Sequence, residues 1–322
     1  MRIEYKVING SAQIIRCFGS DPVVVLPEMV DGYEVKSVAA YAFSARKSTE
    51  DLDVLVYRTE GDRTDRSLEM ILAGERVEQV IFPDTVEEIG NYIFYGCKML
   101  EKLEFSDNLV SLGSGAFTGC GRIRALKVHL YHGRKTCVKE ILGDLWQRID
   151  VEFVRGEQCA RFVFPEHYEE AVENTPARIL FTQHHGSGNL YRQCFYSKEL
   201  DCGKYDEIFP LAVVQDPMEV LADMTFGRLM GFEEMTKSSR ERYEGYLKEH
   251  LIEISQYLIK KLDLKTIKFL SERKYWDKET LDEVIRLASK EKDTEIVSFL
   301  MNERNRCYRE QITTERKKKF AL

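Results

Sequence analysis

The N-terminal half of the chain alternates apolar and polar residues over short stretches, and this spacing of two predicts β-strands. Residues 80–86 (Val-Ile-Phe-Pro-Asp-Thr-Val) recur as residues 103–109 (Leu-Glu-Phe-Ser-Asp-Asn-Leu), at an offset of 23 residues. The residues that follow the two strands recur with the same offset. These pairs are Ile89-Gly90 with Leu112-Gly113, Phe94 with Phe117, Cys97 with Cys120, and Leu100 with Ile123.

Each unit predicts a short strand, a glycine turn and a returning segment that carries a bulky Phe and a small Cys. One unit cannot bury its apolar face alone, so we expect successive units to stack as a solenoid around a continuous core. A looser copy starts at residues 23–27 and has a five-residue insertion at Asp31-Gly32, which predicts a surface turn. We expect Cys97 and Cys120 to serve packing, because a chemical site is not copied in every repeat.

The combination of strand-Pro, Val-x-x-Ile-Gly and Phe-x-x-Cys resembles the BspA-like class of bacterial leucine-rich repeats. The resemblance covers about residues 1–130, although Ala39 replaces the Gly in the first copy and the Cys is missing after Phe43. It implies a leucine-rich-repeat solenoid that acts as a binding scaffold. That class is chiefly known for secreted or surface proteins that adhere to host or other bacterial proteins, so a bacterial surface adhesin is one alternative.

The repeat pattern decays after residue 123. Residues 138–146 have helical spacing and predict a capping or inserted helix, and residues 151–154 predict a further strand. Residues 160–165 end in Phe-Pro, so we interpret them as a last degenerate turn that closes the array. These features predict a leucine-rich-repeat domain over residues 1–165, in which the charged stretch 44–76 is either an elaborated repeat or a projecting loop.

Beyond residue 166 the apolar spacing changes to 3.6, which predicts helices. Residues 251–270 recur as residues 281–300 without a gap, at an offset of 30 residues. Each unit predicts two helices, with Asp263 and Asp293 as N-caps of the second. The helix pair is similar to an ankyrin repeat in shape only, since the Thr-Pro-Leu-His signature is absent. The predicted fold is therefore α+β: a leucine-rich-repeat solenoid followed by an all-α domain, 166–322, with helix-hairpin repeats at about 251–304.

Two repeat systems present extended surfaces and concentrate no chemistry, which favours a non-catalytic protein–protein interaction scaffold over an enzyme. We expect protein partners to bind side chains that point outward from the stacked strands. Strand alternation places Val25, Gln79, Ile81, Lys102, Glu104 and Lys127 on that outward face.

Charge and cysteine content narrow the alternatives. The chain has 47 Lys and Arg against 54 Asp and Glu, and a net charge of −7 disfavours binding to nucleic acid. Residues 302–322 carry a net charge of +4, which would attract an acidic partner or nucleic acid, but a solvated tail is the preferred interpretation. The 8 cysteines include no Cys-x-x-Cys pair, so we expect free thiols, no metal site and no cofactor.

No apolar run has the length of a signal-peptide core or of a membrane span, and this predicts a cytoplasmic protein without a membrane partner.

The rival hypothesis from another class is an enzyme or ligand-dependent regulator that uses residues 184–206. There, Gly186-Ser187-Gly188 would cradle an anion, with His184, His185 and Arg192 as the ligand loop. On paper, Cys194 or Cys202 joins Asp201, Asp206 and His185 as nucleophile, base and orienter. An interhelix loop with structural cysteines is the preferred interpretation, so no catalytic residue is predicted.

Overall fold

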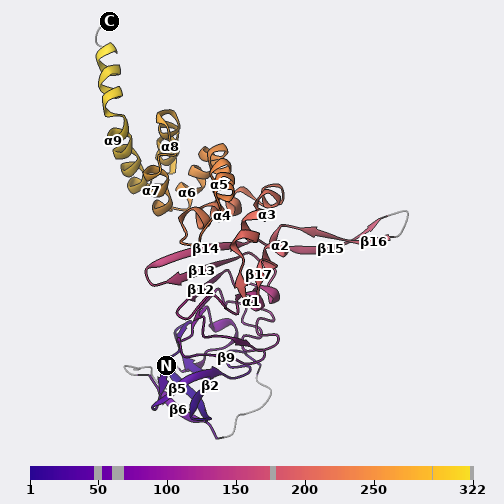
Figure 1. Ribbon diagram of the computed structural model, residues 1–322. Helices are drawn as coiled ribbons and strands as arrows, with labels where there is room; N and C mark the ends of the chain where they lie inside the picture. Colours follow the sequence, from indigo (N-terminus) through magenta and orange to yellow (C-terminus); the bar gives the residue numbers. More distant parts are fainter. Residues whose placement is uncertain (47–52, 60–68, 175–178, 292, 320–322) are drawn as a thin grey trace. The chain divides into compact units, whose positions relative to one another are not determined.

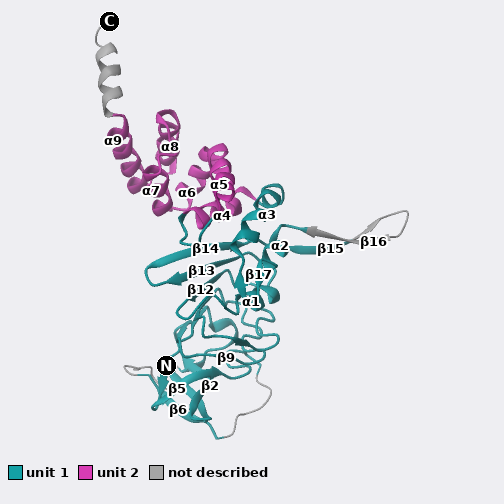
Figure 2. Ribbon diagram, viewed as in Figure 1, with its two compact units in different colours: residues 1–216, 230–235 teal, residues 217–229, 236–322 magenta. Residues whose placement is uncertain are grey.

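The computed structural model describes most of the chain and divides it into two compact units. The residues outside the description are 47–52, 60–68, 175–178, 292 and 320–322, and side chains are not described over 172–184 and 309–319. The first unit comprises residues 1–216 and 230–235, and the second comprises residues 217–229 and 236–322 (Figure 2). A β-rich part is thus followed by a helical part, and the predicted fold class is confirmed (Figure 1).

The first unit is built on a six-stranded sheet whose strands lie in the order β14-β13-β12-β10-β8-β3. All neighbours are parallel except β13 and β14. Leu103 lies opposite Val80, and Glu104 lies opposite Ile81, so the register confirms the offset of 23 residues. The strands are β3 (Val23–Val25), β8 (Gln79–Ile81), β10 (Lys102–Ser106), β12 (Ala125–His129), β13 (Ile149–Arg155) and β14 (Gln158–Phe164).

A second sheet forms the returning side of the repeats, with the strand order β11-β9-β5-β2-β1-β6. Two short strands pair outside this path, β4 with β5 and β7 with β2. The Asp31-Gly32 insertion forms the tight turn between β4 and β5, and both residues have positive φ. The strands are β1 (Arg2–Ile8), β2 (Ser11–Gly19), β4 (Met29–Val30), β5 (Tyr33–Val38), β6 (Leu55–Arg58), β7 (Met70–Ile71), β9 (Glu88–Ile89) and β11 (Ser111–Leu112).

The repeat residues stack on their equivalents in the next turn. The ring of Phe94 lies between those of Phe43 and Phe117, with centroid distances of 5.4 and 5.6 Å. Cys97 Sγ donates a hydrogen bond to the carbonyl of Phe43, and Cys120 Sγ donates one to the carbonyl of Phe94. Both thiols are buried, so the prediction that these cysteines serve packing is confirmed.

The glycine of each repeat turn is required by the distance between successive turns. A Cβ atom at Gly90 would lie 2.3 Å from the backbone nitrogen of Ala40, and one at Gly113 would lie 2.3 Å from that of Asn91. Any side chain at these positions would force adjacent turns apart. The Ile-Gly pair therefore recurs because it sets the spacing of the solenoid.

The sheet closes in a way that the repeat pattern did not predict. Residues 158–164 do not form a further repeat turn; β14 returns antiparallel to β13 as a hairpin, so the degenerate-turn interpretation is wrong. Gly156, with φ of +59°, lies in the two-residue connection between Arg155 and Gln158 and allows the chain to reverse there. The hydroxyl of Tyr205 donates to the carbonyl of Val163 and accepts from its N–H, which satisfies part of the free edge of β14.

Strands continue beyond the predicted domain boundary at residue 165. Two hairpins follow, β15 with β16 and β17 with β18, and the helical part begins only at Cys202. The predicted helix over 138–146 is present as α1. The elements are α1 (Val138–Asp144), β15 (Tyr168–Asn174), β16 (Ile179–His185), α2 (Gly188–Arg192), β17 (Phe195–Tyr196), β18 (Glu199–Leu200) and α3 (Cys202–Gln215).

Within the stretch 44–76, the described residues extend the second sheet. β6 pairs antiparallel with β1, β7 pairs antiparallel with the end of β2, and a 3-10 turn covers Gly74–Arg76. The remainder of the stretch falls within 47–52 and 60–68, outside the described residues. The described part is thus a sheet extension, and the two alternatives for the whole stretch stay predictions.

The second unit is helical and confirms the predicted N-caps. The carboxylate of Asp263 accepts from the N–H of Thr266 at 3.0 Å, and that of Asp293 accepts from the N–H of Ile296 at 2.8 Å. The likeness of these hairpins to ankyrin repeats stays a prediction. The helices are α4 (Met218–Met230), α5 (Lys237–Glu249), α6 (Leu251–Lys260), α7 (Leu264–Glu272), α8 (Lys278–Glu291) and α9 (Thr294–Lys319), with a break at Tyr308.

Candidate binding surface on the outward face of the sheet

The parallel sheet presents two rows of outward side chains, each running across the strands. Between them lies an inward row, which is buried and holds Val24, Val80, Leu103, Leu126, Val151 and Phe162. The first outward row is Val23, Gln79, Lys102, Ala125 and Asp150. The second outward row is Val25, Ile81, Glu104, Lys127, Glu152 and Arg161.

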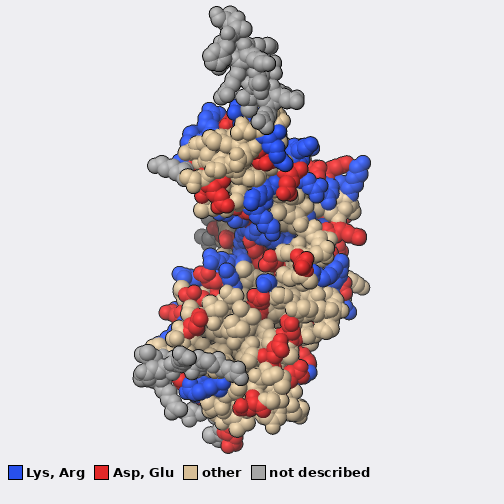
Figure 3. Space-filling model, turned by 90° about the vertical axis from the view of Figure 1, so that its left-hand side faces the viewer, with Lys and Arg blue, Asp and Glu red and all other residues tan. Residues whose placement is uncertain are grey.

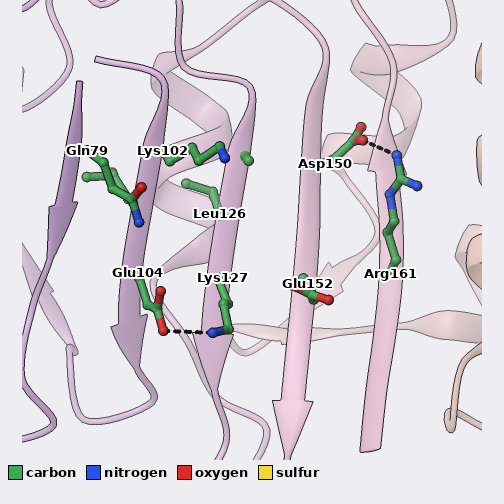
Figure 4. A pocket seen from close by; sticks show the side chains of 10 residues that line it. Gln79, Lys102, Glu104, Leu126, Lys127, Asp150, Glu152 and Arg161 are labelled. Atoms are coloured by element: carbon green, nitrogen blue, oxygen red, sulfur yellow. Dashed lines mark hydrogen bonds and ion pairs between the residues drawn. The ribbon is translucent and has the colours of Figure 1, made fainter. Parts of the chain in front are cut away.

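These outward rows surround a groove of about 450 Å³. Ala125 has the shortest of the outward side chains that line it, so it leaves the space that the longer neighbours border. The polar lining residues project from β8, β10, β12, β13 and β14 (Figure 4). They are Gln79, Lys102, Glu104, Lys127, Asp150, Glu152 and Arg161.

Glu104 is the centre of a charge cluster on the second row. Its Oε1 atom lies 2.9 Å from Lys127 Nζ and 2.7 Å from His129 Nε2. Burial alone would raise the pKa of Glu104, but the hydrogen bonds from His129 and Lys127 outweigh it and hold the pKa below its usual value. Glu104 is therefore an ionised, internally paired carboxylate at neutral pH.

Asp150 forms a second cluster at the other end of the groove. Arg148 pairs with it through both carboxylate oxygens, at 2.9 and 3.2 Å, and Arg161 Nη2 also contacts Oδ2. Two guanidinium groups on one carboxylate fix its orientation. Two clusters of charged side chains, around Glu104 and around Asp150, thus border the groove, and the charges in each cluster pair with one another.

The structure brings together five of the six predicted partner-binding residues. Gln79, Ile81, Lys102, Glu104 and Lys127 lie in register on adjacent strands, and all but Ile81 line the groove. Val25 continues the second row on β3, outside the groove lining, and is 55% exposed. This placement matches the predicted outward orientation, whereas the role of these residues in partner binding stays a prediction.

Repeat spacing did not identify the groove residues beyond β12. Asp150, Glu152 and Arg161 lie on the final hairpin, where Lys127 is opposite Glu152 at an offset of 25 residues instead of 23. α1 is inserted between these two strands and breaks the repeat spacing. The alternation of 151–154 was nevertheless visible, and extending the outward positions along that predicted strand identifies Glu152.

The Gly-rich segment that had suggested a ligand loop is used for internal structure. Arg192 is buried, and its guanidinium donates to five backbone carbonyls. Burial lowers the pKa of Arg192 to about 10, so it remains charged at neutral pH. A guanidinium engaged in this way holds neighbouring chain segments together, which corrects the interpretation of Arg192 as a counter-charge for an anion. The five carbonyls belong to Leu142, Leu145, Gln147, Pro165 and Gly188.

The two glycines of this segment are required by close packing against the end of the sheet. A Cβ atom at Gly188 would lie 2.0 Å from the carbonyl oxygen of Pro165, and one at Gly186 would lie 2.3 Å from that of Glu166. Between them, the buried hydroxyl of Ser187 donates to the carboxylate of Asp216. The backbone is therefore packed against protein atoms at the two glycines, and neither leaves room for an anion.

Two residues of the rival hypothesis, His185 and Cys194, take part in internal contacts. His185 stacks on Tyr168 with a centroid distance of 4.5 Å and lies 3.3 Å from a carboxylate oxygen of Glu170. The side chain of His184 lies outside the described residues. Asp201 is the N-cap of α3, and burial raises the pKa of Cys194 to about 12, so its thiol stays protonated.

On the face shown in Figure 3, basic and acidic side chains lie interspersed. The basic tail continues as helix to Lys319, and its side chains beyond Tyr308 are outside the description. Among the described residues, no group of three or more His, Cys, Asp or Glu is placed to hold a metal ion. Within the same part of the chain, no helix is both long and apolar enough to cross a membrane.

A comparison with protein families supports the repeat assignment over part of the chain. The family described as BspA type leucine rich repeat region matches residues 71–134, with six copies. No curated protein matches the chain. Among solved structures, a leucine rich cell surface protein from Faecalibacterium prausnitzii is 20% identical, with 42% of this chain and 29% of that chain covered and a TM-score of 0.27.

A second similar structure is the leucine rich repeat protein of T. pallidum, with 18% identity, 39% of this chain and 68% of that chain covered, and a TM-score of 0.24. A third is a leucine-rich repeat protein from Bacteroides ovatus, with 16% identity, 41% and 49% coverage, and a TM-score of 0.18. The matched part of this chain spans less than a third of the Faecalibacterium protein. At these TM-scores no function is transferred from the three proteins.

Proposed function

We propose that this protein, whose residues 71–134 are a BspA-type leucine-rich repeat region, is a non-catalytic scaffold that binds a partner protein on the outward face of its parallel sheet. The observation that carries the proposal is the groove of about 450 Å³ at Ala125. It lies where the repeat register aligns side chains from adjacent strands, so the repeats that build the fold also build the surface.

The chemistry of this surface fits protein recognition better than catalysis. Its charged groups lie along the outward rows of the strands, partly exposed and paired with one another, as in the polar rim of a protein interface. The apolar side chains of Val25 and Ile81 continue one row beyond the charges. Among the described residues, the nucleophile candidates Cys194 and Cys202 do not line this groove.

We also propose that the protein acts in the cytoplasm. The support is its cysteine chemistry: all 8 cysteines are free thiols, and Cys97 and Cys120 use S–H groups as hydrogen-bond donors within the core. Fractionation of native cells tests this location. A surface pool of the protein would contradict it and would favour the adhesin alternative.

The proposed function is tested by affinity capture from native lysate with a double variant of the outward row. Ile81→Arg with Glu104→Arg adds two cations to the row that contains Lys127, so we expect at least a tenfold loss of every specifically captured partner. The matched control is Val110→Arg with Glu88→Arg. It makes the same change in net charge, by replacing one aliphatic residue and one Glu with Arg at exposed positions outside the groove, and we expect unchanged capture.

Far-ultraviolet circular dichroism and thermal unfolding of each variant verify that it is folded before capture is compared. Equal capture by wild type and by the folded outward-row variant contradicts the proposed site. Equal losses in both double variants also contradict it, because the effect would then follow from added charge alone.

A further inference from the structure

The groove carries two charges that form no ion pair with any described residue, and they lie at opposite sides of Ala125, although Lys127 on β12 lies opposite one of them, Glu152. Lys102 on β10 is exposed and forms no ion pair with any described residue. Glu152 on β13 is also exposed; it accepts a hydrogen bond from the Cys159 thiol at 2.9 Å and is likewise without an ion pair in the described part of the chain. The other groove charges are already neutralised in the Glu104 and Asp150 clusters.

An apolar surface adjoins the Lys102 side of the groove. Val25 lies opposite Ile81, and Ile81 lies opposite Glu104, so the sheet continues from the groove into aliphatic side chains. Val25 is 55% exposed, and Val23 beside it is 39% exposed. At the opposite end, Arg161 on β14 is polar. Across the strands, the outward face therefore presents a fixed order of side chains: the aliphatic Val25 and Ile81, then the cation Lys102, then the anion Glu152.

The strand geometry sets the distances along this direction. Neighbouring strands lie about 4.8 Å apart, so the Cα atoms of Lys102 and Glu152, two strands apart and in different rows, are separated by roughly 12 Å. An extended chain advances about 3.3 Å per residue, so roughly three to four residues span that distance. Ile81 is one strand from Lys102 on the other side.

Resting on the proposed function, we propose that the groove binds an extended segment of a partner protein with a defined order of side chains. An aliphatic residue packs on Val25 and Ile81, an acidic residue pairs with Lys102, and a basic residue about three or four positions further pairs with Glu152. The small Ala125 admits the backbone between the two charges. This arrangement matches each unpaired charge with its opposite and leaves the internal ion pairs intact.

A displayed library of random 12-residue peptides tests the order directly. Peptides enriched on immobilised wild-type protein are expected to share the aliphatic–acidic–basic order. Their binding is expected to fall about tenfold on Lys102→Glu and on Glu152→Lys, and to stay within twofold on the control variants Lys135→Glu and Glu88→Lys. Both control residues are exposed and lie outside the groove lining.

Charge exchange sharpens the test, because it needs no assumption about folding. A selected peptide whose acidic residue is replaced by Lys should bind Lys102→Glu better than it binds wild type. Enriched peptides without the charge order, binding that is indifferent to both reversals, or a selection that enriches no peptide overturns the inference. If peptides without this order still compete with a captured partner at the groove, the scaffold proposal stands and only the segment chemistry fails.

Discussion

The outward face of the sheet and the Gly-rich segment 183–192 both place charged and polar residues close together, but they use them in opposite ways. On the sheet, Lys102 and Glu152 point out of the protein and have no ion pair in the described part of the chain. In the Gly-rich segment, Arg192 donates to backbone carbonyls and Ser187 donates to Asp216. The amino-acid composition of the Gly-rich segment suggested a ligand site there, whereas the repeat spacing indicated the outward face of the sheet.

The physical reason for the difference is the neighbourhood of each backbone. A strand in a solenoid has its N–H and C=O groups paired with adjacent strands, so its outward side chains are left available. Backbone carbonyls at the end of α1, in its connection to β13, directly after β14 and at the start of α2 have no partner in a sheet, and they need donors. Arg192 supplies them from a single side chain, which places it inside the protein.

The largest expected effect is on the stability of the Gly-rich region. Arg192→Met removes five hydrogen bonds to backbone carbonyls, four of them buried, and we expect it to lower the free energy of unfolding by about 3 kcal/mol or more. Arg161→Met, the matched control in the groove, breaks a partly exposed ion pair and should cost about 1 kcal/mol or less. Urea denaturation of both variants measures the difference. Equal losses of unfolding free energy in the two variants would contradict the difference between the two regions.

A smaller effect is expected from enlarging one small residue in each region. Gly188→Ala places a carbon against the Pro165 carbonyl, and we expect a loss of about 1–3 kcal/mol of stability. Ala125→Leu instead fills open groove space, so stability should change by less than about 0.5 kcal/mol while partner capture falls. Thermal unfolding measures the stability of both variants, and affinity capture measures their partner binding. Unchanged capture by a folded Ala125→Leu protein speaks against the groove as the binding site.

The two regions should also respond to acid with opposite signs. Burial raises the pKa of Asp216 above its value in the unfolded chain, despite hydrogen bonds from Ser187, so its contribution to stability becomes more favourable as the pH falls through its folded-state pKa. The pKa of Glu104 is lowered, so its contribution is present above its unfolded value near 4.5 and is lost as the pH falls below it.

Unfolding free energies of wild type, Asp216→Asn and Glu104→Gln between pH 3 and pH 7 measure these slopes. The advantage of wild type over Glu104→Gln should shrink below about pH 4.5, whereas wild type should gain relative to Asp216→Asn as the solution is acidified. Parallel curves for the two variants would show that the carboxylates have similar environments.

The smallest expected effect concerns the reactivity of the thiols. Burial raises the pKa of Cys97 and of Cys120 to about 12, so an alkylating reagent at pH 8 should leave both unmodified in the folded protein. Cys307 is exposed and should react first. Mass spectrometry after partial alkylation checks the order. Early modification of Cys97 would indicate that the solenoid opens locally.

Repeat spacing predicted the part of the fold that repeats. The pairs Val80 with Leu103 and Cys97 with Cys120 indicated the register correctly, since stacking forces equivalent residues to meet. The closing hairpin was not predictable in this way. Its reversal depends on Gly156 and on Tyr205, a side chain more than 40 residues away along the chain that caps the edge of β14. For the same reason, only part of the groove was predictable. Lys102 belongs to a repeat and follows its spacing, whereas Asp150 belongs to the closing hairpin and does not.

The central claim is that a partner protein occupies the outward face of the parallel sheet, and site-specific photo-cross-linking tests it most directly. Gln79→benzoylphenylalanine places the reactive group at the rim of the groove, and Val110→benzoylphenylalanine places it at an exposed residue outside the groove lining. We predict a covalent adduct with the captured partner from position 79 and none from position 110. An adduct from position 110 alone would contradict the account.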